Sequence, residues 1–415
     1  MRVPHIFVAV MLASVAAPVA AKTIPVAAGD SAQDRLQEAL IVAEPGDTVQ
    51  LGAGIFKLTD GLSLDVPGVT VRGAGASDTG SVLDFTGQMG AGEGLLVTSD
   101  DVLLRDFAVI NTKGDGIKSK GADRIVYFQL RVEWTAGAKE SNGAYGIYPV
   151  ESTDVLVDSV YVRGASDAGI YVGQSNNIIV RDSIATENVA GIEIENSYNA
   201  DVTGNIATKN TGGILVFDLP NLPQMGGRNV RVFENIVSDN MTPNFAPKGN
   251  IVASVPTGTG VLIMANRNVA VFDNIIADHG TANIMVIGYR YPFEDPKYDP
   301  LPRGVVAFGN QHGKAGFAPA MDGGKELAAA LGGAIPAILW DGSGEGIMFG
   351  DAVPALSLGL TDPKAGVAAA KPQPVPPADA AAVKAQETLN AENAAKLGDF
   401  RLPVKLPESM EAKVK

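Results

Sequence analysis

The chain has 415 residues, a formal net charge of -14 at pH 7 and no cysteine. Without cysteine it has no disulfides, no thiolate metal sites and no covalently attached c-type haem. The negative charge argues against nucleic acid or an anionic membrane as the main partner, because both require a basic face. An anionic polymer would require a local basic patch. Forty-eight glycines and an aromatic content of 6% favour tight turns over one large packed globule.

The first 21 residues have the pattern of a secretory signal peptide. Arg2 precedes an apolar stretch from Ile6 to Ala17, and small residues end at Ala21. The apolar stretch is short for a bilayer span, which takes about 20 residues. We therefore predict cleavage before Lys22 and a periplasmic or secreted protein. No later segment is long and apolar enough to cross a membrane, so the mature chain has no predicted membrane span.

A short phrase built on Gly-Ile recurs through the middle of the chain. Its copies begin at Asp115, Tyr145, Ala168, Ala190, Gly212, Thr259 and Ala282. A repeat of this extent overrides the two or three domains that length alone suggests, and it indicates one solenoid.

The period of the repeat identifies the type of solenoid. An Asp or Asn precedes each apolar alternation, and the successive spacings of these residues are 22, 31, 23, 24, 28 and 39; the marker residues are Asp101, Asp123, Asp154, Asn177, Asp201, Asn229 and Asn268. A base period of 22 to 24 with insertions fits three short strands and three turns per coil. The frame of a leucine-rich repeat is absent. We predict an all-β, right-handed, single-stranded parallel β-helix.

Both ends of the predicted solenoid are covered. A helix from Ser31 to Ala43, with Ser31 and Asp34 in capping-box-like positions, forms the N-terminal cap. We assign residues 22–310 to the β-helix with this cap and residues 311–360 to a C-terminal cap. The C-terminal cap is predicted to contain a helix at 322–331 and a hairpin made of 337–340 and 346–349. Residues 361–415 are rich in Pro and Ala, and we expect a mobile tail there.

Polar residues recur at two turn positions. Asn205, Asn235, Asn274 and Asn310 form one series, and Asn188, Asn210 and Asn240 form the other, with His279 in the same register. A metal or sugar site is one interpretation. Bonding between neighbouring coils is the favoured one, because asparagine tolerates left-handed backbone conformations and bonds locally.

Period-two alternation decides which side chains leave the core. The isoleucines of the phrase point inward, so their next neighbours point outward, and coil by coil these are Lys118, Tyr148, Tyr171 and Glu193. Lys118 and Glu193 are roughly 14 Å apart, too far for a direct ion pair. The tyrosines are suited to stacking on sugar rings. Glu193 and Glu195 are suited to acid–base chemistry or to binding a hard cation. An ordinary solvated face is the alternative.

Further residues border this predicted groove. We expect Asp115, Lys120, Asp167, Gln174 and Asn196 to contribute to ligand binding. No metal motif is present, and the sequence indicates no cofactor, although calcium stays open. The outward residues of the later coils, from Leu215 to Ile287, are apolar. We predict that loops 218–228 and 288–303 or the C-terminal cap cover them; otherwise they form a docking surface for an envelope protein.

The sequence from Thr112-Lys113-Gly114-Asp115-Gly116 to Gly191-Ile192-Glu193-Ile194-Glu195-Asn196 resembles the right-handed parallel β-helix superfamily of pectate lyases and alginate epimerases. It is most similar to a bacterial group of exported β-helix repeat proteins to which no reaction is assigned. The likeness continues through Gly212–Pro220 and Thr242–Asn250. The Asp-Pro-His-Asp motif of the alginate epimerases is absent, and the calcium aspartates of pectate lyases have no match. The resemblance implies the fold strongly and the substrate class weakly.

These observations predict a protein that binds carbohydrate or polysaccharide on the outer face of one parallel sheet, as a lyase, epimerase or hydrolase. The alternative is a non-catalytic binding or scaffold protein of the cell envelope. A strongly shifted lysine or glutamate pKa in the groove would favour the enzyme. An open apolar patch would favour the scaffold.

Overall fold

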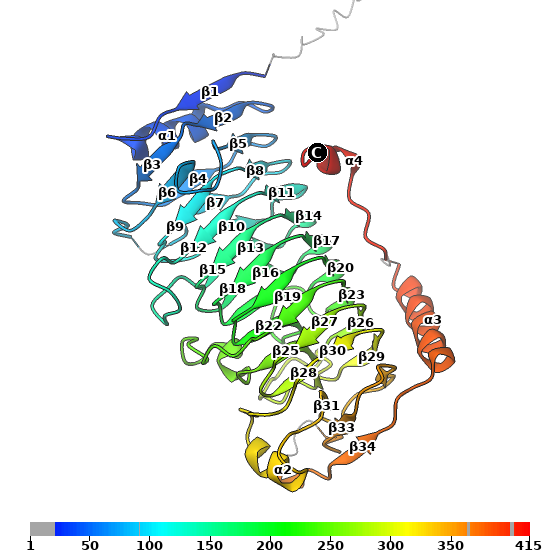
Figure 1. Ribbon diagram of the computed structural model, residues 1–415. Helices are drawn as coiled ribbons and strands as arrows, with labels where there is room; N and C mark the ends of the chain where they lie inside the picture. The colour runs from blue at the N-terminus through cyan, green and yellow to red at the C-terminus, as the bar shows by residue number, and fades with distance from the viewer. Residues whose placement is uncertain (1–20, 91, 363–365, 399–401) are drawn as a thin grey trace, which may run out of the picture.

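The structure is a computed structural model that describes residues 21–90, 92–362, 366–398 and 402–415. The predicted signal peptide lies outside the described residues except for Ala21. In the part described, three long sheets run side by side down one axis, and helices cover the two ends and one flank (Figure 1). No helix among the described residues has the length and apolarity needed to cross a membrane.

The first sheet is formed by twelve parallel strands in the described chain. In spatial order they are β1 (Thr23–Val26), β2 (Thr48–Leu51), β5 (Thr70–Arg72), β8 (Leu103–Arg105), β11 (Ile125–Phe128), β14 (Thr153–Asp158), β17 (Asn176–Arg181), β20 (Tyr198–Thr203), β23 (Arg228–Phe233), β26 (Arg267–Phe272), β29 (Arg303–Phe308) and β32 (Met348–Phe349).

The second sheet contains ten described strands in parallel order. They are β3 (Gly54–Lys57), β6 (Ser81–Asp84), β9 (Ala108–Ile110), β12 (Arg131–Glu133), β15 (Tyr161–Arg163), β18 (Ile184–Thr186), β21 (Ile206–Thr208), β24 (Ile236–Ser238), β27 (Ile275–Ala277) and β30 (Gln311–His312).

The third sheet carries the recurring Gly-Ile phrase. Its strands are β4 (Leu62–Leu64), β7 (Leu95–Val97), β10 (Ile117–Lys120), β13 (Tyr145–Val150), β16 (Ala168–Gly173), β19 (Ala190–Glu195), β22 (Gly212–Phe217), β25 (Thr259–Met264), β28 (Ala282–Ile287), β31 (Ile338–Trp340), β33 (Ala355–Ser357) and β34 (Gln373–Val375). All are parallel except β34, which pairs antiparallel with β33. Each coil therefore supplies one strand to each sheet, as the 22 to 24 residue period predicts.

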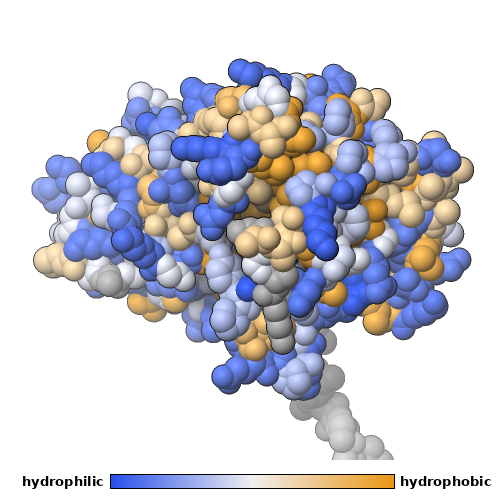
Figure 2. Space-filling view, turned by 90° about the horizontal axis from the view of Figure 1, so that it is seen from below, coloured by the Kyte–Doolittle hydropathy of each residue, from blue (hydrophilic) through white to orange (hydrophobic). Residues whose placement is uncertain are grey.

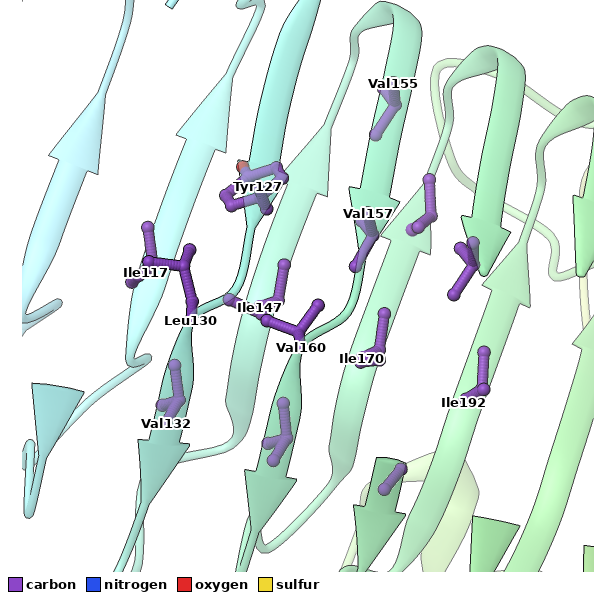
Figure 3. Packing of buried hydrophobic residues seen from close by; sticks show 14 of the residues in the cluster. Ile117, Tyr127, Leu130, Val132, Ile147, Val155, Val157, Val160, Ile170 and Ile192 are labelled. Atoms are coloured by element: carbon purple, nitrogen blue, oxygen red, sulfur yellow. The ribbon is translucent and has the colours of Figure 1, made fainter. Parts of the chain in front are cut away.

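The core is a set of aliphatic columns inside the coils. Ile117 pairs in register with Ile147, Ile147 with Ile170, and Ile170 with Ile192, and all four are fully buried. Figure 3 shows these isoleucines stacked along the axis, facing valines from the other two sheets. The predicted inward column is confirmed. Burying one such side chain contributes roughly 1.5–3 kcal/mol, so each coil adds to the stability of the core.

The two asparagine series are structural ladders. Asn235 Oδ1 accepts from both the backbone N–H and the Nδ2 of Asn205 at 3.0 Å, and Asn235 Nδ2 donates to Asn274 Oδ1 at 2.9 Å. The second series ends at His279, whose Nε2 lies 3.0 Å from Asn240 Nδ2. The favoured interpretation of these residues, bonding between coils, is confirmed.

The N-terminal cap is α1 (Ala32–Val42), which packs on β1, β3 and β4 through buried Leu36 and Leu40. The predicted helix is confirmed, but the capping box is wrong. Ser31 adopts a left-handed conformation with φ of 56° and its side chain makes no capping hydrogen bond. The first turn therefore lacks the side-chain acceptor that a capping box supplies.

The C-terminal cap differs from its prediction in one respect. Its helix is present as α2 (Gly324–Ala330), but the predicted hairpin is wrong. β31 extends the third sheet from β28, while β32 extends the first sheet from β29, and both pairings are parallel. The repeat thus continues past residue 310 as a further coil. Seen from below, this end of the molecule gathers apolar residues within a mostly hydrophilic rim (Figure 2).

The C-terminal segment packs on the solenoid, so the expectation of a mobile tail is wrong for its described residues. Helix α3 (Ala380–Lys396) contacts β26, β29 and β32, and Figure 1 shows the chain running back along the first sheet to α4 (Glu408–Ala412). There Val404, Leu406 and Met410 bury apolar residues on the outer face of that sheet. Arg181 also bonds Glu411 at 2.9 and 3.1 Å. The packing was not predicted because these few apolar residues lie in a segment whose composition is dominated by Pro and Ala.

Distant segments cover the apolar part of the outer face of the third sheet. Leu215, Leu262 and Met285 are buried in a second cluster with residues of loop 241–257, loop 288–303 and the C-terminal cap; the covering residues are Phe245, Val252, Val255, Tyr289, Tyr298, Ile335 and Leu358. The predicted coverage is confirmed, with loop 241–257 as an additional contributor.

Candidate active site on the third sheet

The outward residues of β10, β13, β16 and β19 form one column. Lys118 pairs in register with Tyr148, and Tyr171 pairs with Glu193. Ile147 pairs with Ile170, which places Tyr148 beside Tyr171. The predicted juxtaposition of these four side chains is therefore confirmed.

Three tyrosines pack together at the centre of the column. Ring centroids of Tyr145 lie 4.5 Å from Tyr148 and 4.6 Å from Tyr171, and Tyr148 meets Tyr171 at 4.9 Å. Tyr145 was not among the predicted site residues, although it is the first residue of its phrase. Tyr145 and Tyr148 are half-buried.

Tyr171 is not the open stacking surface that we expected, because it is only 4% exposed. It belongs to the same buried cluster as Val252 and Val255, against which Phe245 and Ile251 pack. These residues belong to loop 241–257, which lies between β24 and β25. The prediction of two exposed tyrosines is therefore wrong for Tyr171. Tyr148 and Tyr145 form the accessible aromatic surface.

Two glutamates lie on the next strand, beneath this aromatic surface. Tyr171 Oη donates to Glu195 Oε1 at 2.7 Å. Burial raises the pKa of Glu195 to about 7, against the opposing effect of that hydrogen bond. Glu193 is 1% exposed, and neither of its carboxyl oxygens has a hydrogen-bond partner among the described residues. Burial, reinforced by the negative charge of Glu195, raises the pKa of Glu193 well above its usual range. Both glutamates are thus outward but covered, which corrects the expected open pair.

Asp167 adds a third carboxyl group at the start of β16. Asn250 Nδ2, in loop 241–257, donates to Asp167 Oδ2 at 2.9 Å. Burial raises the pKa of Asp167 to about 7, although the hydrogen bond from Asn250 opposes the shift. Asn250 was missed by the sequence reasoning as a site residue. Its only signal is its position in an inserted loop, since such loops carry function on solenoids.

Asp115 and Lys118 form the polar edge of the column. Lys118 Nζ lies 3.1 Å from Glu93 and 3.7 Å from Asp115, and 4.7 Å above the ring of Tyr148. Burial raises the pKa of Asp115 to about 6, with Lys118 opposing the shift and Glu93 adding to it. Lys118 is therefore a paired cation. Glu93, which the sequence did not single out, completes the pair.

Three other predicted binding residues lie outside this group. Lys120 pairs with Glu151 at 3.6 Å on the surface. Gln174 lines a separate polar hollow of about 360 Å³ with Glu151 and Gln224. Asn196 is buried, and its Nδ2 donates to the backbone carbonyls of Leu219 and Gln224. Asn196 thus anchors loop 218–228 and contributes nothing to a binding surface.

The two histidines among the described residues, His279 and His312, also lie elsewhere. Burial lowers the pKa of His279 to about 4, and its Nδ1 contacts Asn283 at 2.9 Å at the end of the asparagine ladder. His312 Nε2 lies 3.1 Å from Asp351. Within the described ranges, no group of three or more His, Asp or Glu side chains is arranged to hold a metal ion.

We call Asp115, Lys118, Tyr145, Tyr148, Asp167, Tyr171, Glu193 and Glu195 the tyrosine–carboxyl cluster. Three of its carboxyl groups have pKa values between about 6 and about 7. Such groups are able both to donate and to accept a proton near neutrality. Titratable groups shifted in this way by burial and by like charge mark candidate catalytic sites.

Comparison with known proteins supports the architecture. A family model described as "Right handed beta helix region" matches residues 93–293. An alginate lyase from Paenibacillus sp. is 18% identical, covering 71% of this chain and 97% of its own, with a TM-score of 0.50. The A-module of a mannuronan C-5 epimerase from Azotobacter vinelandii is 13% identical, covering 78% and 92% with a TM-score of 0.46. A family 28 exopolygalacturonase from Yersinia enterocolitica is 12% identical, covering 80% and 72% with a TM-score of 0.42.

No curated protein matches the sequence. Structural likeness at this identity shows the fold alone. The predicted hand of the coil and the predicted fold class are both confirmed. The described chain therefore folds as a right-handed parallel β-helix.

Proposed function

We propose that this protein is an exported enzyme that acts on a polysaccharide by acid–base chemistry at the tyrosine–carboxyl cluster. The observation that carries the proposal is the set of carboxyl groups on one sheet face whose pKa values lie between about 6 and about 7. The substrate class follows the sequence resemblance, and the similar alginate lyase acts on a polysaccharide.

The cluster divides into an accessible and a covered part. Tyr148, Tyr145 and the Lys118–Asp115 pair are half-buried and form the surface that a sugar would meet. Cleavage of a glycosidic bond, by hydrolysis or elimination, requires one group that gives up a proton and one that takes it. Asp115 and Asp167 are the groups closest in pKa to neutrality near that surface. Burial, with the charges of Glu193 and Glu195 adding to it, raises the pKa of Tyr145 and Tyr171 well above the usual range.

Positioning of the substrate would fall to the aromatic surface. Tyr148 offers a ring face for stacking and a hydroxyl for hydrogen bonding. Lys118, held over the same ring at 4.7 Å, places positive charge where a sugar carboxylate or a developing oxyanion would lie. The proposed chemistry uses side chains alone, and calcium is tested directly below.

The test is turnover by the purified mature protein on neutral and acidic glycans, with and without calcium. Ultraviolet absorbance of an unsaturated product reports elimination, new reducing ends alone report hydrolysis, and proton NMR of the polymer reports epimerisation. We expect Asp115→Asn and Tyr148→Phe to lower kcat by roughly 10²-fold or more. Tyr161→Phe is the control, since Tyr161 is a half-buried tyrosine on the second sheet. Binding without turnover would instead identify a sugar-binding protein, and absence of both would overturn the proposal.

Export is a separate part of the proposal. It rests on the signal-like pattern of the first 21 residues. Mass spectrometry of the protein recovered from its native cell should give a chain that begins at Lys22. An intact N-terminus on the accumulated protein would contradict export.

A further inference from the structure

Both ends of loop 241–257 are attached to one residue of the preceding coil. Thr211 Oγ1 donates to the Thr242 carbonyl at 2.9 Å, and the Gly258 N–H donates to the Thr211 carbonyl at 3.1 Å. Thr211 itself is fully buried. The loop is therefore of the Ω type, a surface segment whose ends lie close together, and such loops are frequently functional.

The loop is also braced by its own side chains. Asn244 Nδ2 donates to the carbonyls of Val252 and Val255 at 2.9 and 3.0 Å. Asn244 Oδ1 accepts from the backbone N–H of Ala246 at 3.0 Å. These bonds connect the two halves of the loop to each other, so the loop is built to move as one body on its two fixed ends.

The middle of the loop is held to the third sheet by few contacts. Between residues 243 and 255, one hydrogen bond connects the loop to the rest of the described chain, and it runs from Asn250 Nδ2 to Asp167 Oδ2 at 2.9 Å. Val252 and Val255 add apolar contacts, because both are buried in the cluster that contains Tyr171. The ends of the loop are thus fixed by backbone and side-chain bonds, whereas its middle depends on one polar contact and two valines.

The covered side chains make the closed position costly. Glu193 stands between Tyr171 and Leu215 in the outward column, and both of these neighbours are buried in the same cluster as Val252 and Val255. Glu193 is 1% exposed, and its carboxyl oxygens have no hydrogen-bond partner among the described residues. Burying a carboxyl group without a partner costs free energy. That cost opposes the apolar contacts that hold the loop down.

We propose that loop 241–257 is a lid on the tyrosine–carboxyl cluster and that the bond between Asn250 and Asp167 is its latch. In the closed position that the structure shows, Tyr145 and Tyr148 are half-buried, while Asp167 and Glu193 are covered. Opening of the lid admits solvent and substrate to the covered carboxyl groups. The proposal rests on the proposed function only in treating the cluster as the reacting site, because movement of the loop is measured without turnover.

The lid should respond to pH, because its latch includes a carboxyl group. The titratable side chains around Asp167 are Tyr145 on β13, Asp115 ahead of β10, and Glu193 and Glu195 on β19. The loop adds Lys248, its one charged residue, which is exposed.

The sign of the response follows from burial. Burial raises the pKa of Asp167 and of Glu195 to about 7 in the closed position, whereas solvent returns such groups towards about 4. The closed position therefore holds more protons than the open one. Opening should become more favourable as pH rises from about 5 to about 7, and should level off above that range.

The natural chain contains no cysteine, so a single introduced thiol reports opening directly. Ala190→Cys places the thiol in the buried cluster of the loop valines, whereas Ala185→Cys places it inside the coil, and both alanines are fully buried. Each rate of reaction with a maleimide is divided by the rate of the same variant unfolded in urea at the same pH. We expect the Ala190→Cys variant to react roughly tenfold faster or more than the Ala185→Cys variant.

The relative rate of the Ala190→Cys variant should also rise by roughly tenfold or more from pH 5 to pH 7. Equal relative rates for the two variants would overturn the proposal, because they would show that only global unfolding exposes the cluster. A relative rate that does not change with pH would overturn the role of the carboxyl latch.

A latch variant is tested in the Ala190→Cys background. Asn250→Ala removes the bond to Asp167 and should speed labelling by roughly fivefold or more. Ser254→Ala is the matched control, since Ser254 is an exposed loop residue whose hydroxyl donates to the Ile251 carbonyl within the loop. Equal labelling of the two variants would contradict the latch.

A reversible lock connects the lid to turnover. A Cβ atom on Gly212 would lie 3.0 Å from Cγ1 of Val255, so the pair Gly212→Cys/Val255→Cys should form a disulfide that holds the loop to β22. Oxidation should lower turnover by roughly tenfold or more, and a reductant should restore it. Turnover that is unaffected by the disulfide would overturn the proposal. Absence of turnover in the unmodified protein would count against the proposed function alone, because labelling still reports the loop.

Discussion

At the residue scale, the carboxyl groups of the third sheet are defined by what covers them. Glu193 and Glu195 point away from the β-helix core, yet they are 1% and 7% exposed. Removing a carboxylate from water is costly unless it is paired, so such a group takes up a proton instead. Tyr171 supplies the one strong hydrogen bond to this pair that the structure shows, at 2.7 Å.

Tyr171→Phe tests that hydrogen bond. Because the Tyr171 hydroxyl lowers the pKa of Glu195, its removal should raise the Glu195 midpoint. It should also lower the free energy of unfolding above neutral pH by about 1–2 kcal/mol. Carbon NMR of the carboxyl and denaturant unfolding measure the two effects. Tyr161→Phe is the matched control, and an unmoved Glu195 midpoint would show that the hydrogen bond does not set its titration.

The raised pKa values also make stability depend on pH. Asp167 and Glu195 titrate near 7 in the folded state and near 4 in an unfolded chain. Between these values the folded state holds more protons, so the free energy of unfolding should be greatest near pH 4 and should fall as pH rises through about 7. Asp167→Asn removes one of these groups and should make the fall shallower. Urea unfolding from pH 4 to pH 8 measures it, and identical profiles for the two proteins would contradict the assignment.

At the element scale, side-chain hydrogen bonds at the turns connect successive coils in addition to the strand pairing. Each asparagine of the ladder accepts hydrogen bonds from the coil before it and donates to the coil after it. A buried amide that loses its partner costs the full desolvation of that group. The ladder is therefore a source of stability, and its members need no ligand.

Asn235→Ala should show this cost. Its removal takes the acceptor from the backbone N–H of Asn205 and one of two acceptors from Asn205 Nδ2, which should destabilise the protein by about 2–3 kcal/mol. Ile236→Ala, at an adjacent position that is 42% exposed, should change stability by no more than about 0.5 kcal/mol. Thermal unfolding compares the two variants. Equal effects would mean that the amide contacts contribute nothing beyond their local surface.

At the scale of the whole molecule, the C-terminal segment packs on the last coils of the solenoid and again on coils of its first half. α3 packs near the last coils, whereas the segment from Val404 to Met410 packs near the early ones. It makes few buried contacts compared with the coils, so it should open locally before the solenoid unfolds.

Met410→Ala tests that arrangement. Met410 is fully buried against the first sheet, and truncation of such a side chain costs about 2–5 kcal/mol. We expect faster amide exchange in residues 404–412 and unchanged exchange in β14 and β17. Hydrogen-exchange mass spectrometry measures both, with Met410→Leu as the volume-conserving control. Faster exchange throughout the strands would mean that the segment and the coils unfold as one unit.

The sequence determined the coil, and the tertiary structure decided the sites. The Gly-Ile phrase fixed the period, the inward isoleucines and the shared outer column of Lys118, Tyr148 and Glu193, because strand alternation is local and identical coils stack in register. The exposure of the outward side chains could not be predicted from this local pattern. Tyr171 lies in a buried cluster with residues of loop 241–257, and α3 packs on the first sheet, since coverage depends on packing between segments far apart in the chain. No periodicity within one coil contains that information.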